Sequence, residues 1–364
     1  MPLTLTDRYR GSLLGLACGD ALGTSVEFKP RGSFPPVTDL LGGGPFNLKA
    51  GQWTDDTSMA LCLGESLLRK DGFDPADQMG RYLNWWQWGY LSATGECFDI
   101  GMTVRQALAD YQEHGQPLAG SSDPQTAGNG SLMRLAPVVL FHYPDLAQVR
   151  EFAGASSRTT HGAAEAIECC QLLAGLIAKA LDGASKQQLQ RLDAQGFRES
   201  KVAALAQGNY LDKTRDQIRG NGYCVDSLEA ALWCFQHSDS YAEAVLAAAN
   251  LGDDADTTAA IVGQLAGAFY GPRAYRRTGW PSCTWARRSR PWPTTCWPPP
   301  GVARLPGRCM AVACARRCNT GSSAWTCPSA TAIARPAARP TPRPLPRPPE
   351  SCANTSSGPR ARNG

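Results

Sequence analysis

The sequence predicts an all-α protein, with a single compact helical domain over residues 1–271 and a largely disordered tail over 272–364. Three observations lead to this prediction. Residues 1–271 are rich in Ala, Leu and Gly and contain few runs of β-branched residues. Their apolar residues recur at intervals of three and four, as on one face of a helix. Their number is sufficient for one well-buried core.

The expected helices follow from this periodicity, taken in chain order. A first helix is followed by a Gly-rich break at 19–23, and the second carries an apolar stripe of Met59, Leu63 and Leu67. The expected helices span residues 5–17, 57–68, 79–91, 104–111, 163–181, 228–236, 241–249 and 258–269. Helix N-caps are expected within 225–227 and 238–240, and surface loops at 115–124 and 196–213. Three tryptophans of one helix are expected in the core: Trp85, Trp86 and Trp88.

The composition changes abruptly after residue 271. The tail, residues 272–364, contains 16 Arg, no Lys, no Asp, one acid (Glu350) and 17 of the 27 Pro. Proline this frequent interrupts every candidate helix. Two explanations are open. GC-rich codons translated out of frame give such a composition, which indicates a frameshift close after Gly271. Alternatively, the tail is a genuine basic arm that binds anions.

Charge and cysteine usage restrict the partners and the compartment. Subtracting the tail's +15 from the chain's +4 leaves −11 for residues 1–271, which argues against nucleic acid as a partner of this part. Its seven cysteines lie mostly within apolar helical patterns and lack zinc spacing, which indicates a reducing, cytoplasmic compartment. No segment approaches the ~20 apolar residues of a membrane span. We expect a protein that acts as a monomer, away from membranes.

Two acidic segments nearly 200 residues apart share one pattern. Thr54-Asp55-Asp56-Thr57 and Asp253-Asp254-Ala255-Asp256-Thr257 each have a glycine shortly before them, Gly51 and Gly252, and precede an apolar helical run. Helix capping explains either segment alone, because Thr and Asp are good N-caps. Adjacent carboxylates repel each other, and a helix dipole of about half a charge offsets little of this repulsion. Together, the two segments favour one site for Mg²⁺, Mn²⁺ or Ca²⁺, which prefer oxygen ligands.

Other polar residues fall at breaks between expected helices, where helix ends can converge on one mouth of a bundle. Each has an ordinary structural explanation when taken singly: a surface carboxylate, a capping histidine or a Gly-Asn-Gly turn. These candidates are Glu27, Asp99, Asn129, Gly130, Ser131, His161 and Tyr223.

These motifs, in this order, resemble the ADP-ribosylglycohydrolase family, including the bacterial dinitrogenase reductase-activating glycohydrolase. The resemblance spans about residues 7–271 and is specific in combination, although no single motif is. It rests on Gly-Asp-Ala-Leu-Gly (19–23) with Glu27, Thr-Asp-Asp-Thr (54–57), Asp-Ile-Gly (99–101), Gly-Asn-Gly-Ser-Leu-Met-Arg (128–134), Thr-His-Gly (160–162) and Gly-Asp-Asp-Ala-Asp-Thr-Thr (252–258). The family's last helices have no counterpart in 272–364.

The resemblance implies an all-α domain with two Mg²⁺ or Mn²⁺ ions. The implied metal ligands are Thr54, Asp55, Asp56, Asp254, Asp256 and Thr257. It also implies carboxylates near the scissile bond at Glu27 and Asp99. The implied substrate-binding residues are Asn129, Gly130 and Ser131 at the diphosphate, His161 near the ribose and Tyr223 on the nucleotide.

The activity implied is hydrolysis of the N-glycosidic bond between ADP-ribose and an acceptor, most directly arginine of an ADP-ribosylated protein. Cleavage at the anomeric carbon develops oxocarbenium character, which nearby carboxylates stabilise. Two other classes are open: a hydrolase of O-acetyl-ADP-ribose or another small ADP-ribose conjugate, and a non-catalytic ADP-ribose-binding protein. The intact acidic segments and Glu27 argue against the last class.

Overall fold

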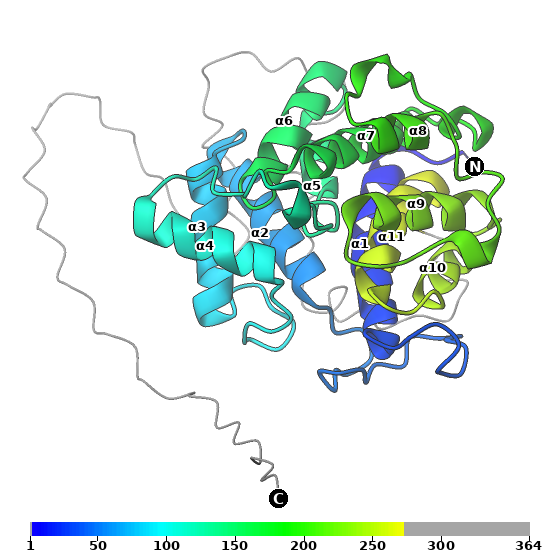
Figure 1. Ribbon diagram of the computed structural model, residues 1–364, viewed down its shortest axis with the longest axis horizontal. Coiled ribbons are helices and arrows are strands. Elements are labelled where there is room, and N and C mark those ends of the chain that lie inside the picture. Colours follow the sequence, from blue (N-terminus) through cyan, green and yellow to red (C-terminus); the bar gives the residue numbers. More distant parts are fainter. Residues whose placement is uncertain (1, 273–364) are drawn as a thin grey trace, which may run out of the picture. The chain divides into compact units, whose positions relative to one another are not determined.

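The computed structural model describes residues 2–272, whose regular structure is helical, without a β-strand (Figure 1). The prediction of an all-α domain is confirmed. The α-helices are α1 (Leu5–Gly23), α2 (Asp55–Lys70), α3 (Pro75–Trp88), α4 (Met102–His114), α5 (Ala136–His142), α6 (Leu146–Arg158), α7 (Ala164–Leu181), α8 (Ser200–Ala206), α9 (Cys224–Gln236), α10 (Tyr241–Ala249) and α11 (Ala255–Tyr270). Short 3₁₀ turns are η1 (Thr24–Val26), η2 (Pro124–Thr126), η3 (Gln187–Leu189), η4 (Ala194–Gly196) and η5 (Arg215–Gln217). The predictions for the tail lie outside the described residues, save Pro272.

The first and last described helices, α1 and α11, lie side by side (blue and yellow in Figure 1). Their backbones are almost in contact. A Cβ added to Gly19 would lie 2.1 Å from the carbonyl oxygen of Ala259, and one added to Gly263 would lie 2.2 Å from that of Gly15. Because Gly19 pairs with Ala259 while the earlier Gly15 pairs with the later Gly263, the two helices run antiparallel. The end of α1 therefore meets the start of α11.

This packing corrects the expected break at residues 19–23, which form the last turns of α1. Glycine weakens an isolated helix by roughly 0.5–1 kcal/mol relative to alanine, and for that reason the segment resembles a loop in sequence. In the protein, the missing side chains allow the backbone of α1 to approach α11, and the burial gained compensates for the weak helix propensity. The continued helix carries Asp20 into the interior, where its side chain is fully buried.

We expect Gly263→Ala to destabilise the domain by about 2–3 kcal/mol, because a Cβ in a filled interior forces backbone to move. The nearest neighbours of this position are backbone atoms of α1, which cannot rotate away as a side chain would. Urea unfolding followed by circular dichroism measures the change. Gly80→Ala in α3 is the matched control: no atom lies within 4 Å of its added Cβ. It should stabilise the domain by up to about 1 kcal/mol. Equal effects of the two changes would contradict the close packing.

Several other expectations differ from the structure. Helices α5 and α6 were not expected; α5 is seven residues long and buried throughout, so it shows no amphipathic period. Helix α8 lies within the predicted loop 196–213. The cap expected at 225–227 lies inside α9, which begins one turn earlier at the N-cap Tyr223. The cap expected at 238–240 is confirmed, since the Ser240 side chain accepts from the N–H of Glu243.

The tryptophan prediction for α3 is correct in part. Trp85 is 1% exposed and lies in the core, and Trp86 is half-buried against it. Trp88 is 75% exposed and lies outside the core. It is the last residue of α3, and Gly89 directly after it adopts a left-handed conformation (φ 62°) that ends the helix. Residue spacing of three places Trp85 and Trp88 on similar faces, but the core does not extend beyond this helix end.

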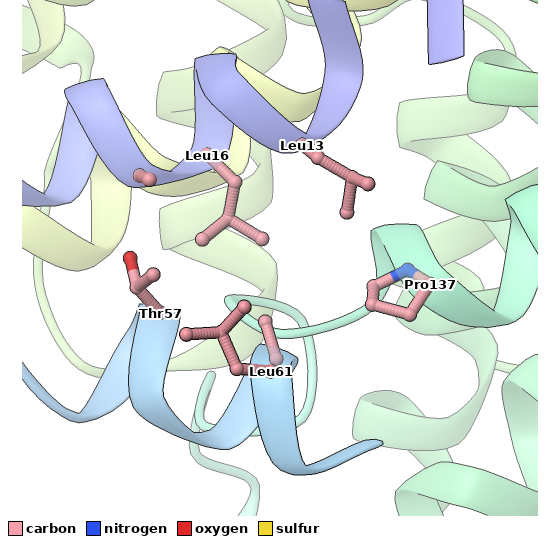
Figure 2. Close-up of a pocket in the computed structure, with 7 residues that line it drawn as sticks. Leu13, Leu16, Thr57, Leu61 and Pro137 are labelled. Atoms are coloured by element: carbon pink, nitrogen blue, oxygen red, sulfur yellow. The ribbon is translucent and has the colours of Figure 1, made fainter. Parts of the chain in front are cut away.

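A small apolar pocket lies between α1, α2 and α5 (Figure 2). It is lined by Leu13, Leu16, Ala17, Thr57, Ala60, Leu61 and Pro137. None of these side chains is titratable, so the pocket offers no acid–base chemistry. The hydroxyl of Thr57 points from α2 towards α1 (Figure 2), where it donates to Asp20 Oδ2 at 2.5 Å. The end of α1 therefore meets the starts of both α2 and α11.

Candidate active site

The first acidic segment begins α2, and its cap is supplied by another helix. The N-cap residue Thr54 makes no side-chain capping bond. Instead, Asp20 of α1 accepts from the backbone N–H groups of Thr54 at 2.9 Å and Thr57 at 3.0 Å. Its two oxygens also lie within hydrogen-bond distance of the two threonine hydroxyls. Asp20 thus accepts from the backbone N–H groups at the start of α2, and neither Asp55 nor Asp56 is needed as a capping group. Capping therefore does not explain these two carboxylates.

The second acidic segment begins α11, and the side chain of its N-cap residue likewise does not cap the helix. Its N-cap residue, Asp254, makes no side-chain capping bond and accepts from Asn129 Nδ2 at 2.7 Å. Asp256 follows in the first turn and is 1% exposed. Thr257 is also buried, whereas Asp253 is exposed. Asp256 Oδ1 accepts from the N–H of Thr257 at 2.8 Å, so one of its two oxygens serves the helix start. The carboxylate of Asp254 and the other oxygen of Asp256 are not used in this way.

The two segments meet at the hydroxyl of Thr54. Its Oγ1 lies 2.9 Å from Asp20 Oδ1, 3.0 Å from Asp56 Oδ2 and 3.2 Å from Asp256 Oδ2. A hydroxyl has one proton and can donate to only one of these three oxygens at a time. Carboxylates from three helices thus crowd around one donor. This convergence was expected for α2 and α11; the contribution of α1 was not.

Two groups of carboxylates have oxygens within 4.8 Å of one another. One consists of Asp20, Asp56 and Asp256, and the other of Glu27, Asp99 and Asp256. Asp256 belongs to both groups and therefore links the acidic helix starts to the pair Glu27 and Asp99.

Burial and mutual repulsion raise the pKa of these carboxyl groups. Burial is the largest cause for Asp55, and the charge of Asp99 the next. Burial followed by repulsion from Asp20 raises the pKa of Asp56, and burial followed by repulsion from Glu27 raises that of Asp256. Raised carboxyl pKa values mean that the cluster resists carrying its full negative charge without a compensating cation.

A hard divalent cation fits this centre. Asp56 Oδ1 is buried and has no hydrogen-bond partner within residues 2–272, so a strong acceptor is left for a ligand. The surrounding groups are all oxygens, as Mg²⁺ and Mn²⁺ prefer. Asp20 differs from the others, because each of its oxygens accepts from a backbone N–H and also lies within hydrogen-bond distance of a threonine hydroxyl. We assign it to positioning Thr54 and Thr57. A charged residue inside an Ala-, Gly- and Leu-rich helical run was the available sequence signal.

Glu27 and Asp99 lie beside the acidic helix starts. Glu27 follows η1 and is 3% exposed. Burial is the main cause that raises its pKa, followed by the charge of Asp99, and the two carboxyl groups are hydrogen-bonded. Asp99 is half-buried, and its pKa is raised mainly by burial and then by Asp254. Carboxyl groups paired in this way are suited to accept and return a proton during a reaction.

The loop after Glu27 is joined to the second acidic segment by paired backbone hydrogen bonds. The N–H of Phe28 donates to the carbonyl of Asp253 at 2.7 Å, and the N–H of Asp253 donates to that of Lys29 at 2.9 Å. Phe28 and Asp253 both adopt left-handed backbone angles, with φ of 61° and 55°. Such angles cost free energy in non-glycine residues and persist where the surroundings enforce them. Glu27 is therefore held relative to the start of α11.

The loop at 128–131 adjoins this centre, and its side chains are engaged by protein groups. Asn129 Nδ2 donates to Asp254 and also to Ser227 Oγ, at 3.1 Å. Ser131 Oγ lies 2.9 Å from Ser157 Oγ, within hydrogen-bond distance, and accepts from the thiol of Cys170 at 3.3 Å. Asn129 thus supports the second acidic segment directly. The expected role of the loop in holding a diphosphate stays a prediction.

His161 and Tyr223 border the same loop from other sides. The His161 ring packs against Gly130, whose added Cβ would lie 2.8 Å from Cε1. Tyr223 forms a backbone bridge with Gly128, and its hydroxyl donates to Glu165 Oε2 at 2.5 Å. The structure thus brings the predicted binding residues to one loop. It does not place Tyr223 in either carboxylate group.

The described domain is all-helical and holds a buried cluster of carboxylates where helix ends converge, an arrangement suited to a hard divalent cation. The ADP-ribosylglycohydrolase family model matches residues 1–282, and the chain belongs to this family of glycohydrolases. The match confirms the resemblance found in the sequence. In the described residues, no helix combines the length and hydropathy required to cross a bilayer.

Individual relatives agree with this assignment. The ADP-ribosylarginine hydrolase Tri1 of Pseudomonas putida is 47% identical over 270 residues, which cover 74% of this chain and 72% of the relative. The ADP-ribosyl-[dinitrogen reductase] glycohydrolase of Rhodospirillum rubrum is 32% identical over 269 residues, which cover 73% of this chain and 86% of the relative. A solved structure of an ADP-ribosylglycohydrolase-related protein complex has a TM-score of 0.65 at 44% identity and covers 78% of this chain and 92% of its own.

Proposed function

We propose that this enzyme hydrolyses the N-glycosidic bond between ADP-ribose and an arginine side chain of a modified protein. The relatives from Pseudomonas putida and Serratia proteamaculans, 47% and 42% identical, are both named ADP-ribosylarginine hydrolases. The structural observation that carries the proposal is the position of Asp256, which belongs to both carboxylate groups. Through Asp256, a cation-binding centre adjoins the Glu27–Asp99 pair, which is able to transfer a proton.

The proposed cofactor is a pair of Mg²⁺ or Mn²⁺ ions. The residues that would hold them lie at the starts of α2 and α11: Thr54, Asp55, Asp56, Asp254, Asp256 and Thr257. When bound, such ions orient ribose hydroxyls and offset negative charge. The partnerless Asp56 Oδ1 and the raised carboxyl pKa values support this proposal.

In the proposed reaction, the bond from the anomeric carbon of the distal ribose to the guanidine nitrogen breaks, and a bond from that carbon to a water oxygen forms. The carbon passes through an oxocarbenium-like state that carboxylates stabilise. The carboxyl oxygens of Glu27 and Asp99 lie within 4.8 Å of each other, and burial raises the pKa of both groups. Between them they can take a proton from the attacking water and return one to the leaving guanidine, so that proton balance is maintained.

We further propose that Asn129, Gly130 and Ser131 line the position of the diphosphate, with His161 near the ribose and Tyr223 near the nucleotide. Their convergence on one loop beside Asp254 supports this arrangement. The proposed partner is an ADP-ribosylated protein or a small ADP-ribose conjugate. We propose that the enzyme acts as a monomer in the cytoplasm; the free thiols of all seven cysteines in the described residues suit a reducing compartment.

Incubation with a protein mono-ADP-ribosylated on arginine, with Mn²⁺ or with EDTA, tests the proposal. We expect free ADP-ribose and an unmodified arginine, in amounts that depend on the metal. Parallel assays with O-acetyl-ADP-ribose and with a phosphoester cover the competing substrates. Release from O-acetyl-ADP-ribose but not from arginine would replace the proposed substrate, and binding of ADP-ribose without turnover of any conjugate would indicate a non-catalytic protein.

A further inference from the structure

Arg134 is a fully buried cation in the described domain, with no carboxylate within ion-pair distance among those residues. Its guanidinium lies 4.7 Å from the centre of the Tyr82 ring, and its Nε has no hydrogen-bond partner in residues 2–272. Burying an unpaired charge costs several kcal/mol, on the order of the ion's desolvation penalty. Packing of the Arg134 side chain in the core does not by itself account for a charge buried at this cost.

The strongest polar contact of Arg134 is with a threonine hydroxyl. Its Nη2 donates to Thr160 Oγ1 at 2.6 Å and, more weakly, to Thr159 Oγ1 at 3.4 Å. Thr160 Oγ1 in turn lies 2.8 Å from His161 Nδ1. These contacts connect the buried cation to the histidine in two hydrogen bonds.

The direction of these bonds follows from the chemistry of the three groups. A guanidinium can only donate, so Thr160 Oγ1 accepts from Arg134. The hydroxyl then has one proton to donate, and His161 Nδ1 is its other partner. If the hydroxyl donates to Nδ1, that nitrogen is an acceptor and carries no proton. In a neutral imidazole, the proton is then on Nε2.

The His161 ring is neutral and fixed in place. Burial, followed by the charge of Arg134, lowers the pKa of His161 to about 3. Its backbone N–H donates to the carbonyl of Ser157 at 2.7 Å, and Ser157 Oγ donates to the carbonyl of His161 at 2.9 Å. The Nε2 edge lies against the loop at 128–131: an added Cβ would be 3.3 Å from Nε2 at Gly128 and 3.1 Å at Gly130.

We propose that Arg134 is a positioning residue, which acts through the Thr160 hydroxyl to keep the His161 proton on Nε2, facing the loop at 128–131. His161 is thereby a permanent hydrogen-bond donor at this loop and not an acceptor. Where ADP-ribose occupies the loop, as in the proposed function, this N–H donates to a ribose or phosphate oxygen. Only this last step rests on the proposed function; the arrangement of the three residues does not.

The position of the proton is measured directly by nitrogen NMR of protein labelled with ¹⁵N-histidine. The chain has four histidines, and His161→Gln identifies the signals of His161. We expect the wild type to show a protonated Nε2 and a hydrogen-bonded, unprotonated Nδ1. The Thr160 oxygen can accept two hydrogen bonds, but the positive charge of Arg134 beside it disfavours a second N–H donor at the same oxygen. In Arg134→Met this repulsion is lost, so the proton should shift towards Nδ1. Arg134→Lys retains a donor and should restore Nε2–H. A protonated Nδ1 in the wild type, or no change in Arg134→Met, would overturn the proposal.

Thr160→Val provides an independent test if Arg134→Met does not fold. Valine keeps the shape of threonine but removes the hydroxyl, so the Nδ1 signal should move to the position of a nitrogen without a hydrogen bond. Thr159→Val is the matched control, since Thr159 also contacts Arg134, whereas the hydroxyl next to His161 Nδ1 is that of Thr160. An unmoved Nδ1 signal in Thr160→Val, or an equal movement in Thr159→Val, would contradict the connection through Thr160.

Activity gives a second readout. Partners that orient a site histidine typically contribute about 10–100-fold to activity, and we expect kcat/KM of Arg134→Met to fall by a factor in this range, with rescue by Arg134→Lys. A shifted proton with unchanged kcat/KM would refute the effect on catalysis. If the wild type releases no ADP-ribose, the proposed function fails, and the NMR measurement still decides the role of Arg134.

Discussion

Replacing Asp256 with asparagine is expected to abolish stabilisation by metal and to give the largest loss of turnover at the site. Asp256 is buried and belongs to both carboxylate groups, so one change affects each of them. In the wild type, metal at 100 times its dissociation constant should add about 2.7 kcal/mol to the free energy of unfolding. Residues that hydrogen-bond to metal ligands usually contribute about 10–100-fold to activity. The loss of kcat/KM for a ligand itself should exceed this range. Melting curves and steady-state kinetics, each with and without Mn²⁺, measure both effects.

Asp253→Asn is the matched control, because it removes the same charge from the same acidic segment. Asp253 is exposed and outside both carboxylate groups. Asparagine tolerates its left-handed backbone angle, φ 55°. We expect metal stabilisation and turnover close to those of the wild type. Stoichiometric metal retained by Asp256→Asn, or similar losses in the two variants, would show that Asp256 is not a ligand.

The second large effect is expected for Glu27→Gln, which should lose turnover while still binding ADP-ribose. Glutamine keeps the shape of the side chain and can still donate to Asp99, but it cannot exchange a proton. A general acid or base contributes about 10²–10⁴-fold, and kcat should fall by a factor in this range. Calorimetric titration with ADP-ribose should give a dissociation constant within a few-fold of the wild type.

Glu151→Gln serves as the control for this change, since Glu151 is an exposed residue of α6. It should leave both kcat and ADP-ribose binding unaltered. Near-normal turnover of Glu27→Gln would transfer the proton-exchanging role to Asp99, and Asp99→Asn would then have to show the loss instead. A parallel loss of ADP-ribose binding in Glu27→Gln would indicate a role in holding substrate.

The acidic centre could be predicted because its residues carry a local signal. Consecutive carboxylates at two helix starts are unfavourable without a partner, and the structure brings Asp56 and Asp256 to the same hydroxyl. Asp20 carries only a weak signal, a charge within an Ala-, Gly- and Leu-rich run, and Arg134 carries none of this kind. A buried charge is identified by its surroundings, and those of Arg134 come from α2, α3 and the segment at 159–160, far apart in the sequence. The ligand and substrate roles of individual residues remain predictions.

Most helices were also predictable, since amphipathic periods mark those that lie at the edge of the core. Helices α5, α6 and α8 and the end of α1 were not predicted, and packing explains two of these cases. Helix α5 is buried on every side, so its apolar residues show no helical period. The end of α1 contains glycines that favour a loop locally but permit contact with α11. In both cases, tertiary packing decides the conformation, and it outweighs the local preference.

The pairing of α1 with α11 has a consequence for the order of events during synthesis. Ser12 Oγ donates to the carbonyl of Gln264 at 3.0 Å, a contact between residues 252 positions apart. At about 5–20 residues per second, the ribosome takes tens of seconds to make the chain between them. Throughout that time, the glycine face of α1 has no helix to pack against. Contacts this distant in sequence slow folding. The nascent chain can close its core only after α11 has left the exit tunnel, and chaperones have that interval in which to bind it.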